Sequence, residues 1–142
     1  MYNIFLHSHS YIRYFILICL IAVIIKSFIG WLNNKPYTAF DNKLGLYLLI
    51  FTHLQLVAGI VLYFISPFVQ FNSETMKDKV TRFWTVEHVT GMLIVVALIT
   101  IARSTSKRMS SDQLRHKRLA IVNLIALIVV IAMLALSGRG VL

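Results

Sequence analysis

Four long apolar runs constrain this chain more than any other feature of its sequence. Each run reaches, or nearly reaches, the roughly 20 residues that a helix needs to cross the hydrocarbon core of a bilayer. The runs carry at most one charge each and cover Tyr14–Ile25, Leu44–Val69, Phe83–Ala102 and Leu119–Leu136. The first run extends back to Ile4 if a few polar residues are tolerated. Because the connections between the runs are short, they leave no room for a separate soluble domain. We therefore expect an all-α protein with a single domain over residues 1–142.

Polar residues and prolines between the runs predict where the helices begin and end. Asn33-Asn34-Lys35-Pro36 breaks the first helix, and Ser66-Pro67 ends the second. Asp41 and Asn42 are placed to cap the second helix, and Ser110-Ser111-Asp112 offers a cap for the last. The pattern predicts a four-helix transmembrane bundle with helices over residues 4–32, 42–66, 80–104 and 113–136.

The composition supports this interpretation. Of 142 residues, 58% are hydrophobic and 13% charged, which is too apolar for a soluble domain of this size. We expect the first run to be a mature helix rather than a signal peptide, because residues 1–10 carry no Lys or Arg. Cys19 is the single cysteine, so the chain forms no intramolecular disulfide and no Cys-rich metal site.

The basic charge of the chain follows the predicted topology. The net charge is +9. Nine Lys and Arg fall on the side of the first and third connections: Lys26, Lys35, Lys43, Arg103, Lys107, Arg108, Arg115, Lys117 and Arg118. Five fall on the other side: Arg13, Lys77, Lys79, Arg82 and Arg139. The positive-inside rule therefore predicts that both termini are periplasmic. The charge suits the lipid bilayer and its anionic headgroups as a partner, and does not indicate nucleic acid.

Glu87 and His88 are the most informative polar residues in the apolar runs. They are adjacent, near the outer end of the third run, where ionisable side chains are rare and usually have partners. At helical spacing both stack over Gly91, whose missing side chain lets a second helix or a flat group come close. We expect the function of the protein to involve this pair.

The first predicted helix also carries polar groups at its outer end. At helical spacing His7, Tyr11 and Tyr14 share one face, while His9 and Arg13, four residues apart, share another. Two polar faces near one end of a membrane helix imply that they contact protein, a cofactor or the headgroup layer.

The second predicted helix places polar groups close to the bilayer midplane. Gln55 and Gly59 lie on one stripe of this helix, and His53 lies some 200° around the axis from Gln55. An unsatisfied donor or acceptor in hydrocarbon costs several kcal/mol, so these groups should not face lipid.

The number and depth of the histidines favour a haem b site. Two imidazoles on facing helices at the same depth ligate haem b in membrane bundles. His88 lies roughly 7 Å inside the outer boundary, and His7 and His9 begin the first helix at that end. We expect His88 to pair with His7, or as second choice with His9. His53 lies about 18 Å from the outer end, so a pair with His88 would need a tilted haem.

Other interpretations of these residues need no cofactor. A membrane histidine also forms hydrogen bonds between helices, and Arg13 and Glu87 also suit a buried ion pair. Alternatively, Arg13 offers a counter-charge to a haem propionate, a quinone oxygen or a phosphate. His116 is expected on the basic surface. The sequence has no HExxH-like spacing, which disfavours a metal hydrolase, and Glu87 lies too near one surface for a proton-coupled transport site.

Several segments resemble a family of small four-helix membrane proteins of Bacteroidetes-type bacteria labelled "cytochrome b". They are Leu6-His7-Ser8-His9-Ser10-Tyr11-Ile12-Arg13-Tyr14, Trp31, Asp41-Asn42-Lys43-Leu44, His53-Leu54-Gln55-Leu56 with Gly59 and Tyr63, Arg82-Phe83, Glu87-His88 and His116-Lys117-Arg118. The resemblance implies haem b bound by membrane histidines, with ligand duty on His7, His53 and His88, and an inner-membrane location. The chain is also faintly similar to cytochrome b561 and haem A synthase-like bundles, but it lacks their regular two-histidine pairing.

The sequence thus predicts a multi-pass protein of the bacterial inner membrane that acts as a b-type cytochrome-like electron carrier or a haem-bearing subunit of a respiratory assembly. The expected haem site involves His88, His7, His53, Arg13, Glu87, Gly91 and Gln55. The alternative is a cofactor-free accessory subunit of a larger respiratory or export complex. An enzyme acting on its own is the less favoured interpretation. The sequence leaves open a quinone as partner and a homo-oligomeric state.

Overall fold

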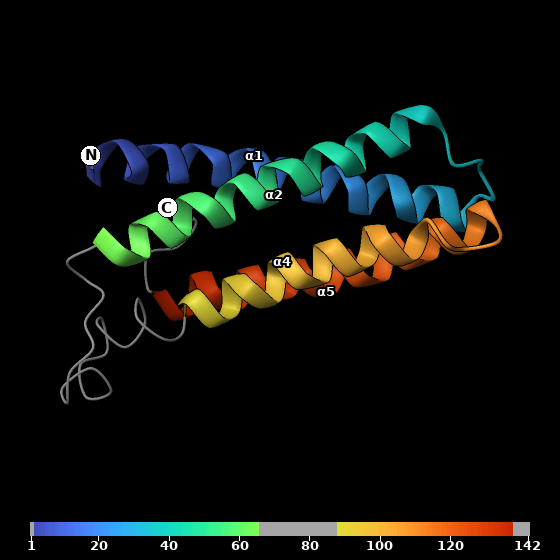
Figure 1. The fold of residues 1–142 in the computed structure, drawn as a ribbon. Helices are drawn as coiled ribbons and strands as arrows, with labels where there is room; N and C mark the ends of the chain where they lie inside the picture. The colour runs from blue at the N-terminus through green and yellow to red at the C-terminus, as the bar shows by residue number, and fades with distance from the viewer. Residues whose placement is uncertain (1, 66–87, 138–142) are drawn as a thin grey trace.

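A computed structural model describes residues 2–65 and 88–137, and this part of the chain is almost entirely helical (Figure 1). The helices are α1 (Tyr2–Leu32), α2 (Ala39–Ile65), α4 (His88–Ser106) and α5 (Asp112–Ser137). All four contain a segment long and apolar enough to cross a membrane, which confirms the predicted all-α architecture with four membrane-length helices. The predicted start of the third helix near residue 80 lies outside the described residues.

The connection between α1 and α2 shows how local chemistry sets the helix ends. Asn34 adopts a left-handed φ of 53°, and the Lys35 amide donates to the Gly30 carbonyl at 3.0 Å, a C-terminal motif that closes α1. Thr38 and Asp41 form a reciprocal cap, in which the Thr38 amide donates to Asp41 Oδ2 at 2.9 Å and the Asp41 amide to Thr38 Oγ1 at 3.3 Å. The second helix therefore begins at Ala39, three residues before the predicted start at Asn42, because Thr38 is the cap.

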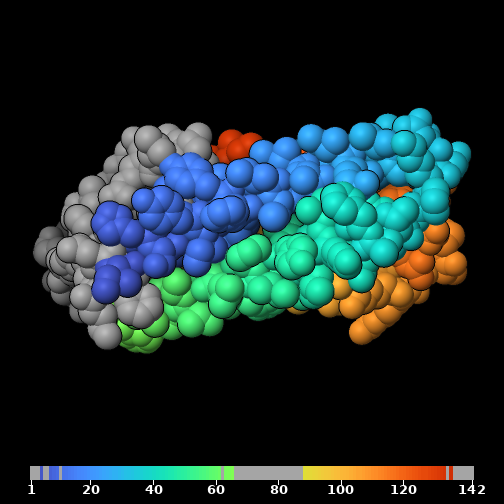
Figure 2. Space-filling view, turned by 90° about the horizontal axis from the view of Figure 1, so that it is seen from above, coloured from blue at the N-terminus to red at the C-terminus, as the bar shows by residue number. Residues whose placement is uncertain are grey.

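The four helices are antiparallel to their chain neighbours and form a ring in the order α1, α2, α4, α5 (Figure 1). Figure 2 shows α1 and α2 side by side along the bundle. We call the end with the connections at residues 33–38 and 107–111 the loop end, and the opposite end the terminal end. Since α1 contacts α2 and α5, it lies diagonally across the bundle from α4.

An apolar cluster fills the middle of the bundle. It draws on all four helices and consists of Ile16, Leu20, Val23, Ile24, Leu48, Val95, Ile99 and Ala126. Leu20 and Ala126 are completely buried. This layer separates the polar groups of the loop end from those of the terminal end.

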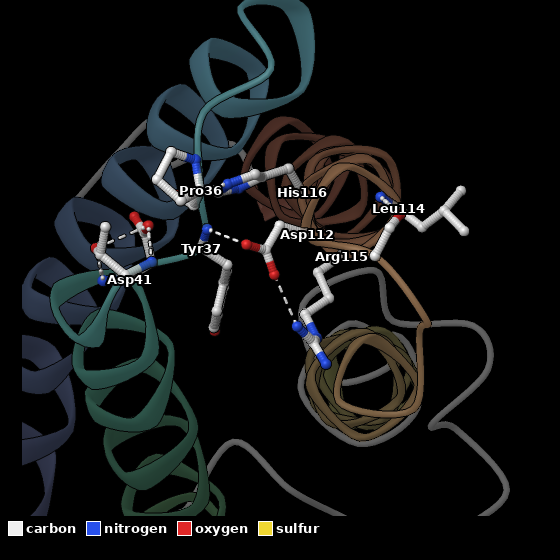
Figure 3. Close-up of polar contacts among 9 residues, drawn as sticks. Pro36, Tyr37, Asp41, Asp112, Leu114, Arg115 and His116 are labelled. Atoms are coloured by element: carbon white, nitrogen blue, oxygen red, sulfur yellow. Dashed lines mark hydrogen bonds and ion pairs between the residues drawn. The ribbon is translucent and has the colours of Figure 1, made fainter.

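His116 lies in the packed interior of the loop end, so the expectation that it is a surface residue is wrong. Its side chain is 2% exposed and packs against Gly30 of α1, where an added Cβ would lie 2.6 Å from the ring. The ring of Tyr37 covers it at a centroid distance of 5.6 Å, and Nε2 lies 3.4 Å from the Pro36 carbonyl oxygen (Figure 3). The 33–38 connection folds over α5 and covers a side chain that sequence alone places in solvent.

Further polar contacts join the two helical hairpins at the loop end. The Tyr37 amide donates to Asp112 Oδ2 at 3.1 Å, and Asp112 Oδ1 accepts from Arg115 at 2.8 Å (Figure 3). Burial raises the pKa of the Tyr37 hydroxyl, and the charge of Arg103 partly opposes this effect. The guanidinium of Arg103, 7% exposed, donates to the carbonyl and side-chain oxygens of Asn42, both at 3.2 Å. These contacts connect the two hairpins, and their donors are matched with acceptors, as expected of a structural clamp.

Candidate functional site

A cavity of about 340 Å³ lies between the helices on the terminal side of the apolar cluster. All four helices line it, mainly α2 and α4, and most of the lining side chains are aliphatic or aromatic. The polar ones are His9, Arg13, Thr52, Gln55, Tyr63 and His88. A mostly apolar cavity of this size with a few convergent polar groups is typical of sites for small molecules and cofactors.

His9 of α1 and His88 of α4 face each other across this cavity. Their ring centroids are 6.3 Å apart and their planes meet at 68°. Because α1 and α4 are diagonal neighbours, the line between the rings crosses the centre of the bundle. If each ring bound the same metal ion through one nitrogen, with metal–nitrogen bonds of about 2.0 Å and about 1.2 Å from nitrogen to ring centroid, the centroids would lie about 6.4 Å apart. The observed separation is close to that value.

Gln55 of α2 holds the His9 segment. Its Nε2 donates to the His9 carbonyl oxygen at 2.8 Å, although the two residues are 46 positions apart. Gln55 Oε1 and His9 Nδ1 are both buried, and neither has a hydrogen-bond partner among the described residues. Side chains with such an acceptor usually orient the ring of a ligand histidine, and Gln55 is held next to His9 by its bond to the His9 carbonyl oxygen.

Gly59 and Arg13 shape the cavity beside His9. A Cβ added at Gly59 would lie 3.4 Å from Cε1 of His9, an ordinary contact, so the imidazole packs directly against this turn of α2. Arg13 follows His9 by one helical turn and also lines the cavity, with its guanidinium 5.3 Å from the centroid of the Tyr14 ring. Among the described residues that line the cavity, Arg13 is the basic side chain close to the imidazole pair.

The structure brings together only some of the residues predicted for the site. Arg13, Gln55 and His88 line the cavity, whereas His7 and His53 are exposed and do not. His7 and His9 are two residues apart, which is about 200° around a helix, so the inward turn of His9 directs His7 outward. The same offset separates His53 from Gln55. His9, the second choice at the sequence level, is thus the histidine that faces His88.

Gly91 contributes to packing rather than to the cavity. It is buried against α5, and a side chain there would overlap the sulfur of Met133, which itself lines the cavity. Gly91 therefore leaves space for a methionine and not for a flat ligand. Glu87, and with it the predicted contact between Arg13 and Glu87, lies outside the described residues.

Two methionines and a tyrosine also line the cavity, and no sequence pattern predicts a role for them: Met92, Met133 and Tyr63. Apolar side chains at helical spacing do not show which of them border an empty space. The sequence does contain a pattern that indicates an inward position for His9. His9, Arg13, Ile16 and Leu20 follow one another at intervals of four, three and four residues. The last two are core residues, so this stripe points inward.

Comparisons with protein-family models, with curated proteins and with solved structures give no match to this chain. The chemistry of the site is therefore inferred from its own geometry. The described residues contain no cluster of three or more His, Cys, Asp or Glu side chains that could hold a metal ion. Two opposed imidazoles suit a haem, whose porphyrin supplies the four other iron ligands, and the apolar lining suits its macrocycle.

Proposed function

We propose that this protein is a b-type cytochrome-like membrane protein that binds one haem b between His9 and His88. The observation that carries the proposal is the pair of imidazoles 6.3 Å apart across an apolar cavity in the centre of the bundle. A bound haem b supplies one-electron redox chemistry. The protein would then act as an electron carrier or as the haem-bearing subunit of a respiratory assembly.

Each polar group of the cavity has a role in this proposal. His9 and His88 would be the residues that hold the iron, and their positions on α1 and α4 are set by the packing of the bundle. Gln55 anchors the His9 backbone, and its Oε1 would be the acceptor for the ring nitrogen of His9 that does not bind iron. Arg13 provides a counter-charge for a propionate. The apolar cluster lies between the cavity and the loop end, and it keeps water from reaching the cavity from that end.

The proposal includes an orientation in the bacterial inner membrane. The loop end carries exposed basic side chains, namely Lys35, Lys43, Lys107, Arg108, Lys117 and Arg118. By the positive-inside rule this end is cytoplasmic, and the cavity then lies in the periplasmic half of the bilayer. A redox partner, such as a quinone or a neighbouring subunit, would meet the haem from that half.

Haem content is the direct test of the proposed function. The protein is purified from a bacterial membrane with haem synthesis intact, and haem b is measured as its pyridine complex against protein concentration. We expect one haem per chain and a reduced-minus-oxidised spectrum of a low-spin b-type centre. A folded protein without haem, which also fails to bind added haemin at one equivalent, would contradict the proposal. The cofactor-free accessory subunit would then be the better description.

A further inference from the structure

The cavity between His9 and His88 reaches the outer surface of the bundle on one side. Of the described residues that line it, three have exposed side chains: Ile60 and Phe64 on α2, and Leu93 on α4. The described lining residues of α1 and α5 are all buried or half-buried. The cavity is therefore open to the outside between α2 and α4.

The contacts between neighbouring helices explain why the opening lies there. At the loop end α2 and α4 are joined, because Arg103 of α4 donates to the Asn42 carbonyl oxygen of α2. Toward the terminal end, the side chains by which these two helices face each other line the cavity instead. At the same level α1 and α2 are joined by the bond from Gln55 to His9, and Gly91 of α4 packs against α5.

The surroundings of the opening restrict what can pass through it. Ile60 and Leu93 both lie within segments long and apolar enough to cross a membrane, so in a bilayer the opening meets acyl chains and not water. Its border is apolar. A molecule that enters here must first dissolve in the hydrocarbon core, as a flat and largely apolar macrocycle does.

We propose that haem b reaches its site from the hydrocarbon core, through the opening between α2 and α4. This inference rests on the proposed function, because it assigns a route to the same cofactor. Leu93 lies about 7 Å from His88 along the axis of α4, so a molecule that passes Leu93 arrives beside the imidazole pair. Before haem is bound, acyl chains of the surrounding lipid occupy the opening.

Photolabelling by lipid tests the opening without haem and without any substitution. The protein without cofactor is placed in phosphatidylcholine vesicles whose acyl chains carry a diazirine, and labelled residues are mapped by mass spectrometry. Val96, 9% exposed, lines the cavity, whereas Ile99, 2% exposed, lies one turn further along α4 and does not. We expect label on Val96 and none on Ile99. Label confined to outer residues, or equal label on Val96 and Ile99, would overturn the opening.

Addition of one equivalent of haemin to the same vesicles connects the opening with the cofactor. Haem in the cavity displaces the acyl chains, so the label on Val96 should fall, while the label on Ile94, which is exposed and does not line the cavity, should not change. Unchanged label on Val96 in a protein that has bound haem would overturn the route. A protein that binds no haem contradicts the proposed function and the haem route together, whereas the label on Val96 still decides whether the cavity is open to lipid.

The rates of haem uptake and haem loss test the route itself. Uptake of haemin in vesicles is followed by absorption, and loss by transfer to apomyoglobin. Leu93→Trp should slow both rates about fivefold or more and leave the final haem content unchanged, because a narrower route hinders both directions equally. The matched control is Ile94→Trp, since Ile94 is 46% exposed and Leu93 51%, and only Leu93 lines the cavity. Equal rates in the two variants, or a Leu93→Trp protein that only loses haem faster, would overturn the route.

Discussion

The imidazoles of His9 and His88 lie 6.3 Å apart, and they come from helices that are diagonal neighbours in the bundle. The distance between the two rings depends on all four helices, because α1 and α4 have no extensive contact with each other and are held apart by α2 and α5. The loop-end clamp around His116 and Arg103 fastens the two hairpins to each other. The cavity at the other end then has walls that are held in place.

Gln55 should control the behaviour of His9 as a ligand. Replacement of Gln55 by Leu removes both the bond to the His9 carbonyl oxygen and the buried acceptor. We expect haem affinity to fall about 10-fold to 100-fold, with a changed reduction potential of the haem that remains. Haemin titration and a redox titration measure the two effects. Gln55→Glu keeps an acceptor but loses the amide that donates to the His9 carbonyl oxygen, so it separates the two roles of Gln55. Equal behaviour of the Leu variant and the wild type would remove Gln55 from the site.

Gly59 should set the space available beside His9. An alanine Cβ would lie 3.4 Å from the His9 ring, an ordinary contact, so Gly59→Ala should bind haem nearly as well as the wild type. Gly59→Leu should fill the cavity wall and weaken haem binding about tenfold or more. Circular dichroism shows whether both variants stay helical. If the Leu variant is helical and binds haem normally, the ligand does not occupy this cavity.

Gly30 should be needed for the packing of His116. A methyl group at residue 30 would lie 2.6 Å from the imidazole of His116, within a packed region. Gly30→Ala should therefore lower the free energy of unfolding by about 1–3 kcal/mol. Addition of His116→Ala should reverse part of that loss in a double-mutant cycle, measured by unfolding in detergent. Strictly additive effects would show that the two residues do not pack together.

The orientation of the bundle can be tested with single cysteines in a Cys19→Ala background. Ser110 is exposed in the loop end, and Ser8 is exposed near the start of α1. Ser110 is a better reporter than Ser106, which is 2% exposed. A membrane-impermeant thiol reagent added to intact cells should label Ser8→Cys and not Ser110→Cys. The reverse pattern would place the loop end outside and the cavity in the cytoplasmic half.

The helices are predictable from the sequence because membrane spans require long apolar runs. Local residues also fix some helix ends, as in the contact between Thr38 and Asp41. The caps that the sequence predicts, Asp41 and Asn42, lie about one turn after the observed cap, Thr38. The position of His116 was not predictable, because its burial depends on a loop folding over α5. A charged neighbourhood in the sequence does not show which side chain that loop will cover.

The sequence indicated at which end of the bundle polar side chains gather, but not which of them line the cavity. Depth restricted the partner of His88 to the start of the first helix, which was sufficient to select His7 and His9. The choice between them depends on the rotation of α1, and this is set by the packing of Ile16 and Leu20 in the core. Likewise, the rotation of α2 decides which of His53 and Gln55 points into the bundle, because the two residues lie about 200° apart around the helix. Polarity in a membrane span favoured an inward position for both, and the structure gives it only to Gln55.

The most direct test of the account compares four histidine variants of the purified protein by reduced-minus-oxidised absorption and by electron paramagnetic resonance. His9→Ala and His88→Ala should each lose the low-spin signal, because each removes one axial ligand. His7→Ala and His53→Ala should keep it, since both side chains point away from the cavity. A full low-spin signal in His9→Ala or His88→Ala, or its loss in His7→Ala, would contradict the assignment of His9 and His88 as the haem ligands.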